Sequence, residues 1–304
     1  MDVLVNLLSA AFYEGLAYGL VAIGVYLTFR VLAFPDLTVD GSYPLGGAVA
    51  AILIVNGVNP WLATVAALGA GLCAGLATSL LNTKLRITAL LAGILMMAAL
   101  YPINLMVMGG QANIGLLREI TVFDQVSQFL GIDDKVTLSI IFMVILAIII
   151  LLILNWFLRT EIGLALRATG ENEQMVRGLG GNTDMTTILG VSISNGLVAL
   201  AGALLAQRGG GADVGMGIGM IVMGLASVII GEAIFRPRGV TAILLAVVGG
   251  TFIYRLFIGV ALRFHLVSAS NLKLITAVLV IIALAIPYIQ KKLRHEWVPP
   301  AARM

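Results

Sequence analysis

Residues 137–158 read TLSIIFMVILAIIILLILNWFL and contain no charged side chain. An apolar helix needs about 20 residues to cross the hydrocarbon core of a bilayer, so this stretch alone predicts a transmembrane helix. The whole chain shares its character, because 60% of the 304 residues are hydrophobic, only 11% are charged, and the mean hydropathy is +1.07. Soluble proteins have roughly 45–50% apolar and about 25% charged residues, so this composition excludes a soluble fold.

Eight further stretches have a similar length and hydropathy, which predicts an all-α polytopic membrane protein. The nine predicted spans cover residues 8–29, 37–56, 61–82, 87–108, 137–158, 185–206, 217–235, 239–260 and 271–289. The first stretch has no Lys or Arg before it and no small-residue cleavage site after it, which favours a retained helix over a signal peptide. A broken or re-entrant second segment would move the N-terminus to the other side of the membrane.

Lysine and arginine in the short loops predict the orientation, because cytoplasmic loops carry an excess of both. With alternating crossings, twelve of the 18 basic residues fall on one side, which we assign to the cytoplasm: Arg30, Lys84, Arg86, Arg159, Arg167, Arg177, Arg236, Arg238, Lys291, Lys292, Arg294 and Arg303. The N-terminus and the loop at 109–136 are then outside the cell. The loop at 159–184 and the C-terminus are then in the cytoplasm, and no loop leaves room for a soluble domain.

Catalytic and metal motifs are missing from the sequence. None of the five lysines follows a glycine, so the chain has no P-loop and cannot hydrolyse ATP itself. There is no Gly-x-Ser-x-Gly or His-Glu-x-x-His motif. A single cysteine, Cys73, and two distant histidines, His265 and His295, exclude a disulfide framework and predict no metal site.

Polar residues at membrane depth face the interior of a helix bundle, a partner or water, because exposing them to lipid is costly. Pro35 suits the start of a helix, and Asp36 and Asp40 suit its positive N-terminal end. This segment, which continues through Tyr43, is therefore either a capped helix start or part of a gate or translocation path.

Other polar residues within the predicted spans allow the same two interpretations. Asn104 lies beside a methionine-rich stretch, and Asn195 lies in the sixth span, where it either lines the path or bonds to a neighbouring helix. Arg255 in the eighth span either pairs with an acid of another helix or serves the path. Glu232 is expected to pair with Arg236 at spacing i, i+4.

Six glycines precede the seventh span, at positions 209, 210, 211, 215, 217 and 219. Glycine permits unusual backbone conformations and close approach of helices. This cluster predicts either a broken or re-entrant segment that lines a cavity or a site of close helix packing.

The predicted inside loop contains a short helix candidate, Glu171–Arg177. Acidic residues open it, Arg177 closes it and glycines 178, 180 and 181 end it. A short helix held between glycine turns is either a rigid knob that docks on a partner or a solvated turn.

Several motifs resemble a known family. EIGLALRATGEN at 161–172, GLG at 178–180 and ALAGAL at 199–204 resemble the permease subunits of branched-chain amino acid and ribose importers, which belong to the ATP-binding-cassette (ABC) transporters. FPDLTVDGSYPLGG at 34–47 and LAGILMMAALYPINLMVMG at 91–109 resemble a subgroup with some members linked to tryptophan or other aromatic amino acids. The resemblance covers roughly 10–290. It departs at Tyr43, where Phe is usual, and at Pro102, where Ser is usual.

The resemblance implies a type II-like importer membrane subunit with about eight to ten helices in two inverted halves, in a bacterial inner membrane. It also implies a homodimer, a separate ATPase that carries ATP and Mg, a periplasmic or lipoprotein binding protein, and no cofactor on this chain. The inside loop becomes the coupling segment that contacts the ATPase, through Arg167, Glu171, Glu173, Met175, Val176, Gly178, Leu179 and Gly180.

The leading hypothesis is therefore the permease subunit of an ATP-driven importer for a small solute, which the resemblance implies to be an amino acid, with aromatic ones included. Alternating access would move the substrate. A secondary transporter or channel is the alternative, with Asp36, Asp40, Glu232 and Arg255 as an ion or proton relay. A membrane scaffold without transport is a third reading.

Overall fold

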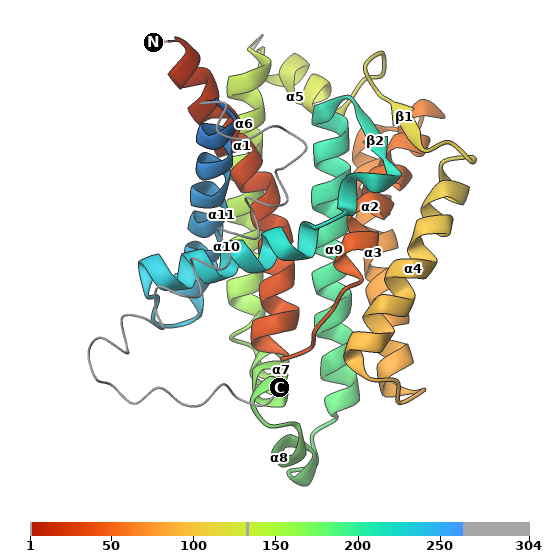
Figure 1. The fold of residues 1–304 in the computed structure, drawn as a ribbon, viewed down its shortest axis with the longest axis vertical. Helices are drawn as coiled ribbons and strands as arrows, with labels where there is room; N and C mark the ends of the chain where they lie inside the picture. The colour runs from red at the N-terminus through yellow and green to blue at the C-terminus, as the bar shows by residue number, and fades with distance from the viewer. Residues whose placement is uncertain (1, 132–133, 264–304) are drawn as a thin grey trace.

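The computed structural model describes residues 2–131 and 134–263, whose regular elements are helices and one small two-stranded sheet. Figure 1 shows the arrangement of the elements. In chain order these are α1 (Asp2–Val25), the π-helix η1 (Tyr26–Val31), α2 (Val39–Val55), α3 (Pro60–Thr83), α4 (Ala89–Val107), β1 (Asn113–Gly115), α5 (Val122–Leu130), α6 (Lys135–Phe157), α7 (Glu161–Glu171), α8 (Glu173–Gly178), α9 (Thr183–Gly209), β2 (Gly211–Asp213), the 3-10 helix η2 (Val214–Gly217), α10 (Met220–Phe235) and α11 (Val240–Arg263).

The predicted all-helical membrane fold is confirmed. Among the described residues, seven helices are long and apolar enough to cross a membrane: Phe12–Val31, Pro60–Thr83, Ala89–Val107, Val136–Phe157, Thr183–Gly209, Val214–Phe235 and Val240–Val260. Each of them overlaps one of the predicted spans. The predicted ninth span, 271–289, lies outside the described residues.

The second predicted span differs from a full-length crossing. Residues 33–37 form no regular secondary structure, and α2 that follows has only 17 residues. Figure 1 shows that α1 runs the length of the bundle to the end where α7 lies, and that the chain then climbs back into the bundle before α2 begins. Segment 37–56 is therefore a short helix that starts inside the protein, after a linker without regular secondary structure.

The two long loops lie at opposite ends of the bundle, as predicted (Figure 1). The loop at 109–136 contains β1 and α5, and β1 pairs antiparallel with β2 in the register Ile114↔Ala212. The loop at 159–184 contains α7 and α8. The start of α1 lies at the same end as α5 and the small sheet.

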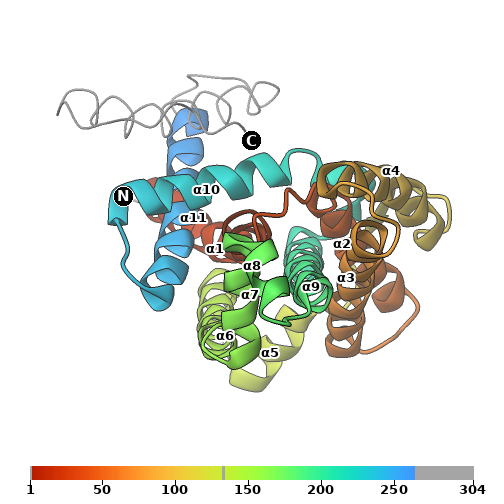
Figure 2. The same ribbon diagram turned by 90° about the horizontal axis from the view of Figure 1, so that it is seen from below.

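The glycine cluster before the seventh span forms a break, as one of its two interpretations predicts. Between α9 and α10 the chain forms β2 and then η2, and Gly219 adopts a left-handed backbone with φ +90°. Close packing also occurs, because a Cβ at Gly217 would collide with the carbonyl of Asp40. Figures 1 and 2 show that α10, although apolar and long enough for a span, lies across α1 and α9 rather than alongside them.

Helix α9 is the centre of the bundle and packs against α1, α2 and α3. Its contact with α2 depends on two glycines. A Cβ at Gly46 would collide with the carbonyl of Ala199, and a Cβ at Gly202 would collide with the carbonyl of Tyr43. These glycines bring the two backbones together and allow short polar side chains to bond between the helices.

We predict that Gly46→Val lowers the stability of the protein by about 1–3 kcal/mol, because the new side chain overpacks the α2–α9 contact. Thermal unfolding of the detergent-purified protein measures this change as a lower Tm. Gly69→Val in α3 is the matched control, because no atom of the described residues lies within 4 Å of a Cβ at that position. Equal Tm values for the two variants would show that α2 and α9 are not closely packed.

Candidate functional site

The first feature of the site is the start of α2 inside the bundle. Asp36 is fully buried, and its Oδ1 accepts a hydrogen bond from the backbone N–H of Thr38 at 2.9 Å. The hydroxyl of Thr38 lies 2.8 Å from that of Thr78 in α3. A backbone N–H at membrane depth has no water to bond, so this carboxylate satisfies an otherwise orphaned donor.

Asn195 joins the central helix α9 to this helix start. Its Nδ2 donates to Oδ2 of Asp36 at 2.7 Å and to the carbonyl of Val191 at 3.0 Å, and its Oδ1 accepts from the hydroxyl of Ser42 at 2.7 Å. Asp36, Ser42 and Asn195 are all 0% exposed. Both Asp36 and Asn195, for which the sequence left a structural role and a role in the path open, therefore hold α2 against α9 in this conformation.

Asp40 links the starts of α2 and α10, which we call the broken helices because each begins after an irregular segment of the chain. Its carboxylate lies in the first turn of α2 but accepts hydrogen bonds from the backbone N–H groups of Gly219 at 3.0 Å and Ile221 at 2.8 Å, at the start of α10. Gly219 is the N-cap of α10 and supplies no side-chain cap of its own. The negative carboxylate satisfies free N–H groups and the positive end of the α10 dipole.

Tyr43 and Arg255 meet through a residue that the sequence analysis did not single out. Tyr43 is buried and stacks on Tyr18 of α1, with ring centroids 6.3 Å apart and 20° between the planes. The guanidinium carbon of Arg255 lies 3.6 Å from the centroid of the Tyr18 ring. Nη1 of Arg255 also pairs with Oε2 of Glu14 in α1 at 3.1 Å. Arg255 therefore has an acidic partner on another helix, as one of its two interpretations required.

Asn104 completes the set around α2. Its Nδ2 donates to the carbonyl of Gly41 at 3.2 Å, and its buried Oδ1 has no partner in the described part of the chain. The structure thus places five of the six predicted path residues on or against α2, and it connects the sixth, Arg255, to α2 through Tyr18. Glu14 and Tyr18 were missed, although Glu14 was detectable as the one acidic residue in the predicted span 8–29.

Glu232 differs from its prediction. The sequence spacing suggested a pair with Arg236, but the structure bonds Glu232 to Arg30, which is 202 positions away. Nε of Arg30 lies 3.0 Å from Oε1, and Nη2 lies 2.9 Å from Oε2. This two-pronged contact joins the end of η1 to the last turn of α10, because the π-helix brings Arg30 beside α10.

The predicted coupling segment contains two helices, not one. Asn172, which falls inside the predicted helix Glu171–Arg177, has an extended backbone and separates α7 from α8. Its side chain caps α8 by accepting from the N–H of Met175 at 2.9 Å. An asparagine favours this cap over a helix interior, since its short side chain competes for backbone groups.

Arg177 fastens α8 to the start of α9. Its Nε donates to the hydroxyl of Thr183 at 2.6 Å, and its Nη2 contacts Glu173 at 2.7 Å and Asp184 at 3.1 Å. Thr183 and Asp184 are in the first turn of α9. The short helix α8 is therefore tied to the long central helix by side-chain bonds as well as by the chain.

Seven of the eight predicted coupling residues are exposed at this end of the bundle: Arg167, Glu171, Glu173, Met175, Gly178, Leu179 and Gly180. Leu179 is 80% exposed and Met175 is 52% exposed. Val176 is the exception, because it is buried and packs against the chain near Gly181. In this conformation it therefore stabilises the segment from within, and its contact with a partner stays a prediction.

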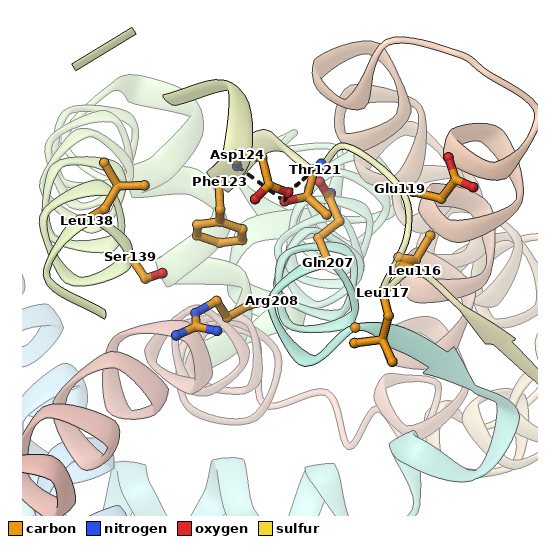
Figure 3. Close-up of a pocket in the computed structure, with 11 residues that line it drawn as sticks. Leu116, Leu117, Glu119, Thr121, Phe123, Asp124, Leu138, Ser139, Gln207 and Arg208 are labelled. Carbon is orange, nitrogen blue, oxygen red and sulfur yellow. Dashed lines mark hydrogen bonds between the residues drawn. The ribbon is translucent and has the colours of Figure 1, made fainter. Parts of the chain in front are cut away.

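Two pockets lie at the ends of the bundle. At the α5 end, a pocket of about 180 Å³ lies between the 116–124 loop, α6 and α9, and Figure 3 shows Arg208 beneath the ring of Phe123 and pointing toward Ser139. At the opposite end, a polar pocket of about 240 Å³ lies between the α3–α4 turn and α8, with Arg86 and Arg177 in its wall. Neither pocket contains a predicted path residue.

Comparison with known proteins assigns the family. Residues 7–284 match the family described as the permease component of branched-chain amino acid transport systems. The chain is 41% identical over 272 residues to the tyrosine transport system permease protein of Clostridioides difficile (strain R20291), covering 90% of this chain and 88% of that one. It is 35% identical over 283 residues to an uncharacterised protein of Rickettsia prowazekii (strain Madrid E), covering 92% and 97%.

More distant similarities agree with this assignment. The chain is 28% identical to the ribose import permease protein of Escherichia coli (strain K12), over 70% of this chain and 64% of that one. Its fold matches a chain of PsaBC from Streptococcus pneumoniae, solved in complex with a Fab, with a TM-score of 0.51 at 15% identity, over 93% of this chain and 91% of that one.

A chain of apolar helices that contains no P-loop agrees with these matches, because an importer of this kind needs a separate ATPase and a binding protein. The protein belongs to the branched-chain amino acid transport permease family and is a multi-pass, non-catalytic permease component of a bacterial ABC importer.

Proposed function

We propose that this permease imports amino acids, aromatic ones among them, across the bacterial inner membrane. The description of the family and the 41% identity to a tyrosine permease support this substrate class. The observation that carries the mechanism is a series of bonds that leads from the exposed helix α8 to the broken helices inside the bundle.

The first step of this series is α8 itself. An ATPase that closes on ATP would push on the exposed surface of α7 and α8, where Met175 and Leu179 offer apolar contacts. Because Arg177 bonds α8 to Thr183 and Asp184, a displacement of α8 moves the lower end of α9. Helix α9 has 27 residues, so as one rigid element it carries the displacement into the bundle.

The second step runs from α9 to the broken helices. Asn195 of α9 bonds to Asp36 and Ser42, so a shift of α9 pulls on the start of α2. Asp40 in the first turn of α2 holds the start of α10. Breaking and remaking these few bonds would open and close a path beside α2 and α10, which is alternating access driven from the ATPase.

A parallel connection reaches the other end of α10. Helix α7 packs against η1, where a Cβ at Gly170 would collide with the carbonyl of Val31. Arg30 at the end of η1 then holds Glu232 in the last turn of α10. Both ends of α10 are therefore linked to the coupling segment, which supports a concerted movement of this transverse helix.

We further propose that the α7–α8 end is cytoplasmic and that two copies form the transport path. Arg30, Arg159, Arg167 and Arg177 are near this end, and a positive cytoplasmic side is the rule for membrane proteins. The predicted C-terminal position in the cytoplasm concerns residues outside those described. A stoichiometry of two permeases to two ATPases in a purified complex would support the homodimer.

The transport function predicts ATP-dependent uptake. Proteoliposomes that contain the permease, its ATPase and its binding protein should accumulate labelled tyrosine when ATP is enclosed, and a protonophore should leave the uptake unchanged. Loss of uptake with the protonophore at constant ATP would instead support a secondary transporter. A permease that copurifies with no ATPase from native membranes would also contradict the importer.

The coupling segment makes a second prediction. Replacement of residues 171–177 by a Gly/Ser stretch should abolish uptake and uncouple ATP hydrolysis from the loaded binding protein, because the rigid contact and the Arg177 bonds are both lost. Membrane insertion should persist, since the segment lies outside the spans. Uptake and ATPase assays on the same proteoliposomes measure the two effects.

A single-residue pair provides the control for this segment. Leu179→Ser at the α8 end should weaken coupling about tenfold, whereas Leu117→Ser at the opposite end should not change it. The two leucines are comparably exposed, at 80% and 89%, so loss of apolar surface alone would affect both equally. Equal effects of the two substitutions would remove the assignment of α8 as the coupling surface.

The bridge at Asp40 makes a third prediction. Asp40→Asn should lower stability by about 1–3 kcal/mol and stop uptake, because the neutral amide presents one acceptor oxygen to two backbone donors and loses its attraction to the α10 dipole. The matched control is Asp213→Asn, which removes a carboxylate that, within the described residues, accepts from Gly215 alone, two residues away, at 2.7 Å. Normal uptake by Asp40→Asn would contradict the role of the bridge.

A further inference from the structure

A charged and aromatic cluster lies beside the broken helices. Glu14 and Tyr18 come from successive turns of α1, Arg255 comes from α11, and Tyr43 comes from the second turn of α2. The carboxylate of Glu14 and the guanidinium of Arg255 are 3.1 Å apart, and the guanidinium also covers the Tyr18 ring at 3.6 Å. Charged residues within membrane-spanning helices are expensive and mark functional sites.

We propose that the Glu14–Arg255–Tyr18 cluster is a transient substrate site that recognises the zwitterionic head and the ring of an aromatic amino acid. The inference rests on the proposed function, since it names residues that read the substrate during transport. The substrate carboxylate binds Arg255, the substrate ammonium binds Glu14, and the substrate ring packs against Tyr18.

Charge complementarity is the first argument. The cluster presents one negative and one positive group in contact, and an α-amino acid carries one ammonium and one carboxylate on the same carbon. Insertion of the zwitterion replaces one ion pair with two and leaves the site neutral. No charge is therefore left uncompensated at membrane depth, which would otherwise be strongly unfavourable.

The accessibility of the two charged groups is the second argument. The Glu14 side chain is 43% exposed and that of Arg255 is 17% exposed, so a ligand can reach the pair from the Glu14 side. Nε of Arg255 is buried without a hydrogen-bond partner among the described residues. The guanidinium thus retains a donor for a second oxygen, which suits the two-pronged bond that arginine makes with a carboxylate.

The tyrosine stack is the third argument. The Tyr18 ring stacks on Tyr43, and the guanidinium of Arg255 lies over the Tyr18 ring at 3.6 Å. If the ligand carboxylate draws Arg255 away, the uncovered ring can accept an aromatic side chain in its place. A movement of Tyr18 on ligand binding would then shift Tyr43 and with it α2. Tyr43 lies one turn after Asp40, which caps α10, so the start of α10 would be affected as well.

The test compares ligands that lack one group with variants that lack its partner. The purified permease–ATPase complex, without binding protein, is titrated with tyrosine, with tyramine, which lacks the carboxylate, and with 3-(4-hydroxyphenyl)propionate, which lacks the ammonium. Wild type should bind each analogue about tenfold more weakly than tyrosine. The Arg255→Gln variant should bind tyramine as tightly as it binds tyrosine, because the partner of the carboxylate is already missing. The Glu14→Gln variant should likewise bind 3-(4-hydroxyphenyl)propionate as tightly as it binds tyrosine.

A structural ion pair gives a different pattern. If Glu14 and Arg255 only hold α1 against α11, each variant will weaken all three ligands by the same factor, and the inference is wrong. The double variant Glu14→Gln/Arg255→Gln keeps the size of both side chains without leaving a lone charge, so it serves if a single variant fails to insert. It should bind tyrosine and both analogues with similar affinity.

The ring contact and the transport function need separate controls. Tyr18→Phe keeps the ring and should bind tyrosine as wild type does, whereas Tyr18→Leu should bind it about threefold to tenfold more weakly. Uptake by the complete transporter is measured in parallel. ATP-dependent tyrosine uptake without the ligand-specific pattern refutes this site alone, whereas absence of amino acid uptake refutes the proposed function.

Discussion

Helices α2 and α10 begin inside this protein, and the packing around them depends on the carboxylates that accept hydrogen bonds from their N-termini. A helix start leaves backbone N–H groups without partners, and at membrane depth no water is available to bond them. Asp36 satisfies the start of α2, and Asp40 satisfies the start of α10. Asp36 lies in the linker before α2, and Asp40 lies in the first turn of α2. The start of α10 therefore depends on where α2 begins.

In the proposed mechanism, this arrangement would carry a small movement at α8 to the centre of the bundle. Gly46 and Gly202 let the backbones of α2 and α9 lie close together. Short hydrogen bonds from Asn195 then join the two helices. A close-packed, hydrogen-bonded contact does not stretch, so α2 either follows α9 or exchanges one set of bonds for another. Transport needs such a discrete exchange, since a path that opened gradually would leak.

Hydropathy predicted most of this fold, because length and apolar character alone identify helices such as α6 and α9. It failed for the direction of α10 and the depth at which α2 begins. Neither the direction of α10 nor the starting depth of α2 is visible in composition, because both segments are as apolar as an ordinary span. What sets them apart is the hydrogen bonding of Asp40 to backbone amides about 180 positions away. The same limit explains Glu232, for which local spacing suggested Arg236 while the fold supplied Arg30.

The polar residues of the site were predictable as a set, since each one is conspicuous in an apolar chain, but their partners were not. Glu14 shows the consequence. As an isolated acid in the first span it has no evident role, and Arg255 alone suggests only an unknown acid. Together with Tyr18 they make a neutral, aromatic surface beside the helix breaks. In the proposed site, a substrate would replace one internal ion pair with two ion pairs of its own, so its net gain in binding energy would be small, which suits a subunit that must release its cargo.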